Sequence, residues 1–207
     1  MLFRSGEVRG NYCTLNPIDQ RGGASFSTGN LTGQTSNAYD SAIAGTFATT
    51  TGKWYCEMSM TANYAAAILY FGLYDITAFG GISGDNATRL YNSNYYWGYY
   101  NNDGKLYYTN VQIAGTSAGS TWGIGDVIGM AWDSDAGTIQ FYKNGVAHPS
   151  TITGLTSKKL MPAWCNGTSG YQTFWANFGQ RPFAYTAPSG FKALCTQNLP
   201  TPTIGLY

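Results

Sequence analysis

The sequence predicts an all-β protein built as an antiparallel two-sheet β-sandwich of the concanavalin-like jelly-roll type. Short runs of alternating apolar and polar residues recur along the chain. Turn residues separate these runs at intervals of about 8–12 residues, as in sandwiches. No segment has the apolar period of a helix longer than one or two turns. A length of 207 residues suits one large all-β domain.

The strongest strand pattern lies at residues 125–145, where two apolar runs flank Asp133-Ser-Asp-Ala-Gly137 and Asn144-Gly145 follows. Asn-Gly favours a type I′ hairpin, because both central residues need positive φ. We therefore predict antiparallel strands at 127–133, 138–143 and 146–148. The first of these is apolar on both faces, which predicts a central strand. The residues expected on inner faces are Ile128, Met130, Trp132, Ile139 and Phe141.

Further strands are predicted along the chain at 11–15, 25–31, 45–50, 52–60, 65–75, 94–100, 105–109, 159–165 and 173–178. In the 52–60 segment, Trp54, Cys56, Met58 and Met60 alternate with more polar residues and are expected to face the core. Pro17 is expected to end the first strand. Residues 32–41 and 79–93 are predicted to be loops.

The chain divides into a lead-in at 1–10, the sandwich at 11–180 and a tail at 181–207. Four of the seven prolines lie in the tail, which has little period-2 pattern. We expect the tail to be extended, and either to wrap the sandwich or to link to a neighbour.

Composition excludes several classes of partner. The formal net charge is +1 and no basic cluster occurs, which predicts no nucleic-acid binding. No apolar run approaches the ~20 residues of a membrane-spanning helix, and the first residues do not resemble a secretory signal. Cys13, Cys56, Cys165 and Cys195 are far apart and show no C-x-x-C spacing. Free thiols are favoured over two disulfides, and no zinc site is expected.

The sequence predicts no enzyme, no catalytic residue and no cofactor. His148 is the single histidine and is expected to be exposed beside a turn, rather than to act as a base. Glu57 is interpreted as a structural residue, either on the polar side of its strand or in a buried ion pair. Asp133 and Asp135 could be calcium ligands, but hairpin-turn chemistry explains them better. No metal site is therefore predicted.

The best binding candidate is the aromatic hairpin at residues 91–108, where aromatic residues alternate with Asn, Ser and Gly. This mixture combines rigid contact area with adaptable hydrogen bonding and also suits stacking on sugar rings. Strand alternation turns some of these rings into the core, so we expect one face to be core and the other to contact a partner. The loops at 79–89, 116–121 and 166–171 are candidate neighbours of that surface. The predicted binding residues are Tyr91, Tyr95, Tyr96, Trp97, Tyr99 and Tyr100.

Several motifs resemble those of SPRY domains and occur in the expected order. They are Gly52-Lys-Trp-Tyr55 with Glu57, Gly125-Asp-Val-Ile-Gly129 continuing to Trp132-Asp133, Phe141-Tyr-Lys-Asn-Gly145, Leu160-Met-Pro-Ala163 and Ala176-Asn-Phe-Gly179. The resemblance covers residues 11–180. It implies a bent two-sheet sandwich that binds proteins through variable loops on one side.

A narrower resemblance concerns the two ends of the sequence. Asn11-Tyr-Cys-Thr-Leu-Asn-Pro17, Ser27-Thr-Gly-Asn-Leu31 and the residues from Asn177 to Pro200 are similar to SPRY-like modules of tailed-bacteriophage virion proteins. This resemblance implies a structural or adhesion protein of a phage tail, fibre or capsid, located in the virion. Its partners would be other virion proteins, copies of itself, or a host-surface glycan or receptor. The alternative is a soluble SPRY-type adaptor or lectin unrelated to a virion.

Overall fold

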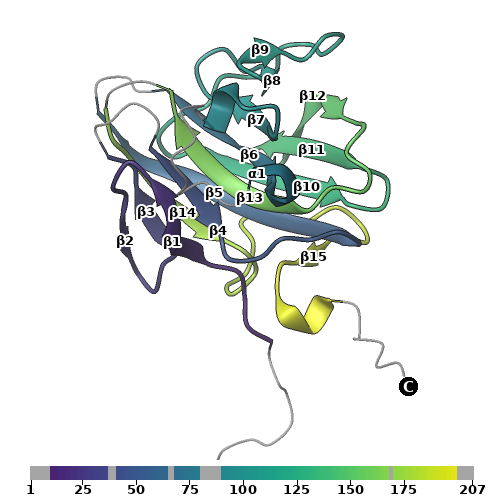
Figure 1. Ribbon diagram of the computed structural model, residues 1–207, viewed down its shortest axis with the longest axis horizontal. Helices are drawn as coiled ribbons and strands as arrows, with labels where there is room; N and C mark the ends of the chain where they lie inside the picture. Colours follow the sequence, from purple (N-terminus) through teal and green to yellow (C-terminus); the bar gives the residue numbers. More distant parts are fainter. Residues whose placement is uncertain (1–9, 37–40, 65–67, 80–89, 168–169, 200–207) are drawn as a thin grey trace, which may run out of the picture.

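The computed structural model describes residues 10–36, 41–64, 68–79, 90–167 and 170–199. Two sheets pack face to face, and their strand pairs are antiparallel apart from one short parallel pair (Figure 1). One sheet has the order β1 (Leu15–Arg21), β4 (Ala42–Gly45), β13 (Leu160–Asn166), β6 (Leu69–Asp75), β7 (Tyr96–Tyr100), β8 (Leu106–Tyr108) and β9 (Val111–Gln112). The predicted two-sheet sandwich is confirmed.

The second sheet has the order β12 (Val146–Ile152), β11 (Thr138–Lys143), β10 (Val127–Asp133), β5 (Lys53–Asn63), β14 (Gln172–Asn177), β3 (Thr32–Gln34) and β2 (Ser25–Ser27). β15 (Lys192–Ala193) pairs in parallel with β5. The helical segments are α1 (Ile76–Phe79), η1 (Leu90–Asn92) and η2 (Thr196–Asn198). Within the described ranges, no helix has the length and hydropathy required to span a bilayer.

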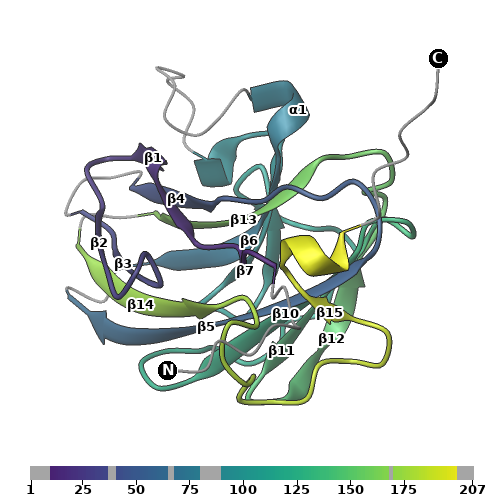
Figure 2. The same ribbon diagram turned by 90° about the horizontal axis from the view of Figure 1, so that it is seen from below.

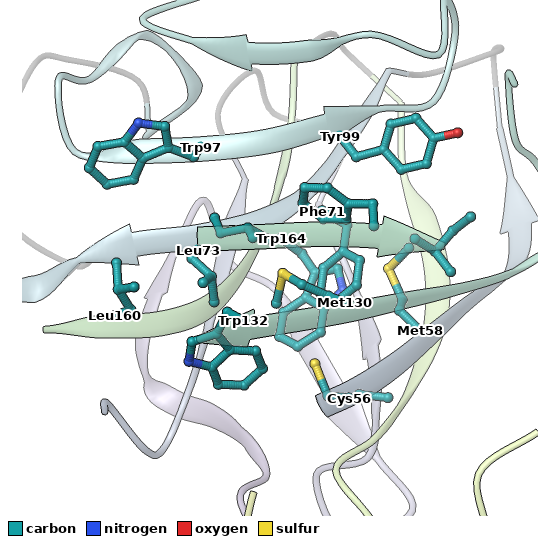
Figure 3. Packing of buried hydrophobic residues seen from close by; sticks show 14 of the residues in the cluster. Cys56, Met58, Phe71, Leu73, Trp97, Tyr99, Met130, Trp132, Leu160 and Trp164 are labelled. Carbon is teal, nitrogen blue, oxygen red and sulfur yellow. The ribbon is translucent and has the colours of Figure 1, made fainter. Parts of the chain in front are cut away.

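The main core lies between the sheets and consists largely of the residues that the alternation predicts (Figure 3). Cys56, Met58, Met130 and Trp132 have no exposed surface. β10 pairs with β11 on one side and β5 on the other, so the predicted central position is confirmed. Burying a large apolar side chain contributes about 1.5–3 kcal/mol, which makes this layer the main source of stability.

Edge strands depart most from the prediction. β1 runs through Pro17 rather than ending there, because β1 is an end strand with no partner on its outer side among the described strands. β12 likewise continues through Pro149 to Ile152, beyond the predicted end at His148. The strand predicted at 45–50 is wrong beyond its first residue, because β4 ends at Gly45 and Thr49 forms only an isolated bridge, with Leu160. β3 occupies part of a segment predicted to be a loop, because Gly33 fits closely against Leu15 and Phe174.

Other differences are smaller. β6 begins at Leu69, and residues 65–67 of the strand predicted there lie outside the described residues. Most of the predicted 79–93 loop also lies outside them, and its end forms η1. The two-residue strand β9 was not predicted, because two residues are too few to show alternation.

Residues 181–199 of the tail lie against the second sheet, where β15 runs beside β5 (Figure 2). Phe183 meets the ring of Tyr55 edge-on, with the ring centroids 4.8 Å apart. Leu194 joins the main core and is fully buried. This part of the tail therefore packs on the sandwich, and the division of the chain at residue 180 stays a prediction.

Candidate partner-binding surface

The predicted aromatic hairpin contributes more to the core than expected. Trp97 and Tyr99 point between the sheets, and Tyr96 is buried on the opposite face of β7. Tyr91 is also buried, whereas Tyr95 and Tyr100 remain half-buried. The expectation that one face would be free for a partner is therefore wrong for most of these rings. The reason is a second apolar layer on the outer face of the first sheet.

This outer layer is a closely packed group of tyrosines. The Tyr70 ring stacks between Tyr91 and Tyr100, at centroid distances of 5.2 and 4.7 Å, and Tyr107 packs edge-on against Tyr70 and Tyr100. Their hydroxyl groups have partners: Tyr70 donates to Asn110 Oδ1 and Tyr107 donates to Asp103 Oδ2 at 2.6 Å. Burial raises the pKa of both phenols. Such a layer is rigid, and it offers a partner little beyond the rims of Tyr100 and Tyr107.

A concave surface lies beside the hairpin instead. We call it the end groove, a cavity of about 530 Å³ between the loop after β9 and the β11–β12 hairpin. Its lining brings together the aromatic hairpin, through Tyr99, and the 116–121 loop that was predicted to neighbour it. The lining residues are Tyr99, Ala118, Gly119, Ser120, Lys143, Asn144, Val146, Ala147, His148 and Pro149.

Lys143 ties the two walls of the end groove together. Its Nζ donates to the carbonyl oxygen of Thr121 at 2.6 Å and lies 3.1 Å from Asp126 Oδ2. Burial alone would raise the pKa of Asp126, but hydrogen bonds from Asn144, Gly123 and Lys143 lower it below the usual value. The carboxylate is therefore held ionised and fixes the loop against the Asn144-Gly145 turn.

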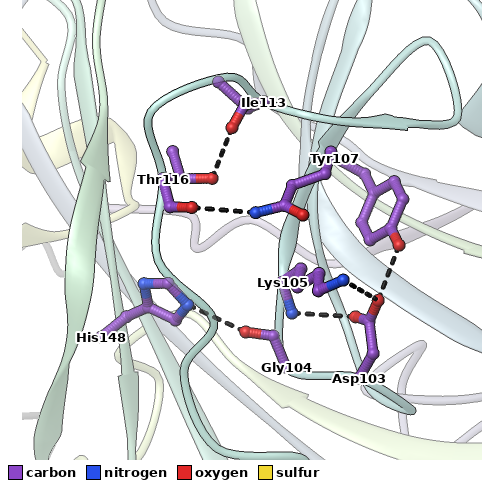
Figure 4. A network of polar contacts seen from close by, with 8 residues as sticks. Asp103, Gly104, Lys105, Tyr107, Ile113, Thr116 and His148 are labelled. Carbon is purple, nitrogen blue, oxygen red and sulfur yellow. Dashed lines mark hydrogen bonds and ion pairs between the residues drawn. The ribbon is translucent and has the colours of Figure 1, made fainter.

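His148 forms part of the groove floor and is not the exposed turn residue predicted from sequence, being only 6% exposed. Its Nε2 donates to the carbonyl oxygen of Gly104 at 3.0 Å (Figure 4), and its Nδ1 accepts from the backbone N–H of Ser150 at 3.1 Å. The ring also contacts the edge of Tyr99. Both nitrogens are thus engaged in positioning the β7–β8 turn over β12. This burial was not predicted, because the strand that is β12 in the structure was expected to end at His148.

Glu57 has the structural role that the sequence favours, but through different partners. It is fully buried, and its carboxylate accepts hydrogen bonds from the backbone N–H groups of Ala184 and Tyr185 at 2.8 and 2.9 Å. The hydroxyl of Tyr55 donates a third, at 3.2 Å. Sequence reasoning missed this contact, because the partners lie 127 and 128 residues away.

The remaining candidate groups also serve the fold. Asp133 Oδ1 accepts from the N–H groups of Asp135 and Ala136, which confirms the hairpin-turn interpretation. Within the described part of the chain, no three His, Cys, Asp or Glu side chains are grouped to hold a metal ion. All four cysteines are buried thiols that form no disulfide. Burial raises the pKa of the Cys13 thiol to about 11.

The two-sheet core and the end groove define the class of protein: an antiparallel β-sandwich with a groove between a loop and a hairpin. Within this class the chain belongs to the SPRY domain family, whose model matches residues 53–181. The family inferred from the sequence motifs is confirmed. A SPRY domain is a protein-interaction module.

Similar proteins support the same assignment. The chain is 34% identical over 97 residues to the dual specificity protein kinase splA of Dictyostelium discoideum, a match that covers 42% of this chain and 4% of the kinase. The chain thus corresponds to a small part of that protein.

Solved structures show the same fold. The SPRY domain of human HERC1 superposes with a TM-score of 0.65 at 17% identity, covering 81% of this chain and 99% of that domain. The TRIM65 PSpry domain superposes with a TM-score of 0.58 at 14% identity, covering 80% of this chain and 92% of that domain. Stonustoxin superposes with a TM-score of 0.56 at 14% identity, covering 79% of this chain and 28% of the toxin chain.

Proposed function

We propose that this chain is a non-catalytic protein-binding module and that its partner docks in the end groove. The proposal rests on one observation: Tyr99, loop residues 118–120 and the β11–β12 hairpin together line a cavity of about 530 Å³. Cavities of this size with mixed polar and apolar walls are typical binding sites. Val146 is 71% exposed on the rim and offers an apolar contact.

The groups that might suggest an enzyme are engaged in structure, which supports a non-catalytic role. His148 uses both ring nitrogens, and the carboxylate of Glu57 accepts three hydrogen bonds at the base of the tail. A general base needs a free position within hydrogen-bonding distance of a substrate.

For the biological setting, we propose a phage virion, in which the module is a structural or adhesion part of a tail, fibre or capsid. The support is the sequence resemblance of the two terminal segments. These segments pack together: the N–H of Cys13 donates to the carbonyl oxygen of Leu194 at 2.9 Å, and Tyr12 forms a β-bridge with Cys195. The partners would be other virion proteins, further copies of the chain, or a glycan or receptor on the host surface.

The second candidate is a SPRY-type adaptor or lectin outside a virion. It is favoured by the eukaryotic source of two similar proteins, the Dictyostelium discoideum kinase and human HERC1.

Photo-crosslinking from the groove tests the binding surface. A photoreactive amino acid replaces Val146 in one sample and Ile18, which is 88% exposed on β1, in another. We expect position 146 to crosslink one defined partner and position 18 to leave it unlinked. Equal crosslinking from both positions, or none from 146, would reject the end groove as the docking site.

Mass spectrometry of purified particles separates the two settings. Peptides of this chain at a fixed copy number in washed virions are expected for a virion component. Their absence from particles, together with a crosslinked cellular protein, would favour the adaptor.

A further inference from the structure

A second cavity lies on the other side of the loop that follows β9. We call it the edge pocket; its volume is about 310 Å³. It is lined by Trp97, Tyr108, Thr109, Val111, Gln112, Ile113, Ala114, Ile152 and Thr153. In Figure 1, β9 and β12, the end strands of the two sheets, lie at the same end of the sandwich. The pocket therefore sits where the space between the sheets opens to solvent.

A row of side chains leads from the core to this opening. The register pairs Trp97 of β7 with Tyr108 of β8, and Tyr108 with Val111 of β9. Directly paired residues point to the same face of a sheet, so all three line its inner face. Trp97 stacks on Tyr108 at 5.3 Å and is 7% exposed, whereas Val111 is 63% exposed. The inner face of the first sheet thus remains apolar beyond the point where the second sheet covers it.

The charges around the edge pocket restrict what fills it. None of its nine lining residues is charged. The nearby Lys158, whose Nζ lies 5.1 Å from the centre of the Trp97 ring, is already paired with Asp75 at 3.3 Å. A charged side chain of either sign would therefore lose its hydration in the pocket without gaining a counter-charge from the lining. The charge pattern therefore selects a neutral, apolar occupant.

The polar groups of the walls also disfavour a sugar. The side-chain amide of Gln112 donates to the carbonyl oxygen of Thr116 at 2.8 Å, and the Thr109 hydroxyl donates to the carbonyl oxygen of Tyr108 at 2.7 Å. A sugar ring needs several donors and acceptors to replace its water contacts. The edge pocket instead offers aromatic and aliphatic surface.

The backbone of the β8–β9 hairpin leaves one strand edge open. Thr109 and Asn110 form the two-residue turn between Tyr108 and Val111, and their φ values of 54° and 56° are those that a type I′ turn requires. The N–H of Ile113 bonds to Leu106 of β8. Because backbone groups alternate along a strand, those of Gln112 point to the open edge. Among the described strands, none pairs with that side of β9.

We propose that the edge pocket binds an extended segment of a partner protein, which lies along β9 and inserts one large apolar side chain beside Val111. Main-chain contacts to Gln112 align the segment, and the neutral pocket selects the side chain. This site is separate from the end groove and does not depend on the function assigned there.

The test uses three acetylated pentapeptides, Ser-Thr-X-Thr-Ser, in which X is Phe, Ala or Lys. They are titrated into the whole chain while NMR follows the Val111 methyl groups and the Trp97 indole N–H. We expect the Phe peptide to give saturable shifts with a Kd of about 1 mM or tighter. The Ala and Lys peptides are expected to bind at least about ten-fold more weakly.

Two exposed valines provide matched variants. Val111→Asp should weaken the Phe peptide about ten-fold or more, whereas Val146→Asp, at the end groove, should leave it within about two-fold. Val111→Asp should not change crosslinking from position 146 in the end groove. The proposal for the edge pocket and the proposal for the end groove can therefore be rejected independently.

Three results would overturn the proposal: no saturable shift with the Phe peptide, equal binding of the Lys peptide, or tighter binding of maltotriose at the same resonances. Preferential binding of a synthetic peptide of residues 200–207 would also overturn it, because the chain's own end would then be the occupant.

Discussion

At the scale of single residues, Glu57 connects the second sheet to the tail through a buried carboxylate. Glu57→Gln replaces one acceptor oxygen by an NH₂ group that faces backbone N–H donors from Ala184 or Tyr185. We expect the free energy of unfolding to fall by about 2–4 kcal/mol, because charged hydrogen bonds are lost and a buried donor is left unpaired. Urea denaturation measures the loss, and amide exchange at Ala184 and Tyr185 should become faster.

Asp135→Asn is the matched control. Asp135 is exposed and accepts one hydrogen bond, from the N–H of Gly52, which an amide oxygen can also accept. Its effect is expected to stay within about 0.5 kcal/mol. Equal effects of the two variants would contradict the assigned role of Glu57.

The cysteines provide a second prediction at this scale. Cys13, Cys56 and Cys165 have no exposed surface, and Cys195 is 3% exposed. Burial raises the pKa of Cys13 to about 11 and that of Cys56 well above its usual value, so the reactive thiolate is scarce at neutral pH. We expect no labelling of the folded protein by a thiol reagent over minutes, and labelling of four thiols in denaturant. Rapid labelling of any one in the folded protein would contradict this packing.

At the scale of elements, the β6–β7 pair depends on Gly72 and Gly98, which lie opposite each other. A Cβ at residue 72 would overlap the backbone carbonyl of Trp97, whereas one at residue 98 would meet the ring of Tyr96, 2.7 Å from its Cε1. A ring can rotate away, but backbone within a ladder cannot. We expect Gly72→Ala to lower the unfolding free energy by more than about 3 kcal/mol and Gly98→Ala to cost about 1–3 kcal/mol. Thermal denaturation compares the two variants, and a larger loss of stability for Gly98→Ala than for Gly72→Ala would contradict this prediction.

Central strands were predictable from sequence and edge strands were not. β5 and β11 alternate apolar and more polar residues, and β10 is a continuous apolar run; each pattern extends over six residues or more, which is long enough to predict a strand. β2, β3 and β9 have two or three residues, which is too short for a period. Pro17 and Pro149 lie within end strands, where a missing N–H on the open side costs nothing. Most errors in the predicted strand boundaries therefore lie in short or end strands rather than in central ones.

At the scale of the whole molecule, the sequence predicts the family and the sandwich because the motifs are core residues, such as Trp54, Trp132 and Phe141. Binding surfaces were harder to locate. The aromatic hairpin has the composition of a paratope, yet its rings fill two apolar layers, one on each face of the same sheet. A single sequence does not show that the outer face is also covered. The end groove depends on contacts between Lys143, Thr121 and Asp126, which only the folded chain brings together.

The buried tyrosines predict how the whole molecule responds to alkali. Burial, and then the negative charge of Asp126, raises the pKa of Tyr99 to about 12. Burial also raises the pKa of Tyr55, Tyr70, Tyr74, Tyr96 and Tyr107. A phenol whose pKa is higher in the folded state than its unfolded value of about 10 binds its proton more tightly when folded. The resulting stabilisation is complete below about pH 10 and is lost as the pH rises through the folded values.

We therefore expect two phases when absorbance at 295 nm is followed against pH. In the first phase, solvent-exposed phenols ionise near the ordinary tyrosine value of about 10, and the far-UV circular dichroism should be unchanged. The buried phenols should ionise together at higher pH, in one cooperative step that coincides with loss of the β-sheet signal, because each ionisation favours the unfolded chain. Tyr70→Phe should reduce the absorbance change of the second step by one phenol. A single titration of all tyrosines near pH 10 with the sheet signal intact would contradict this prediction. It would mean that the tyrosine rings on the first sheet are open to solvent and do not form a rigid outer layer.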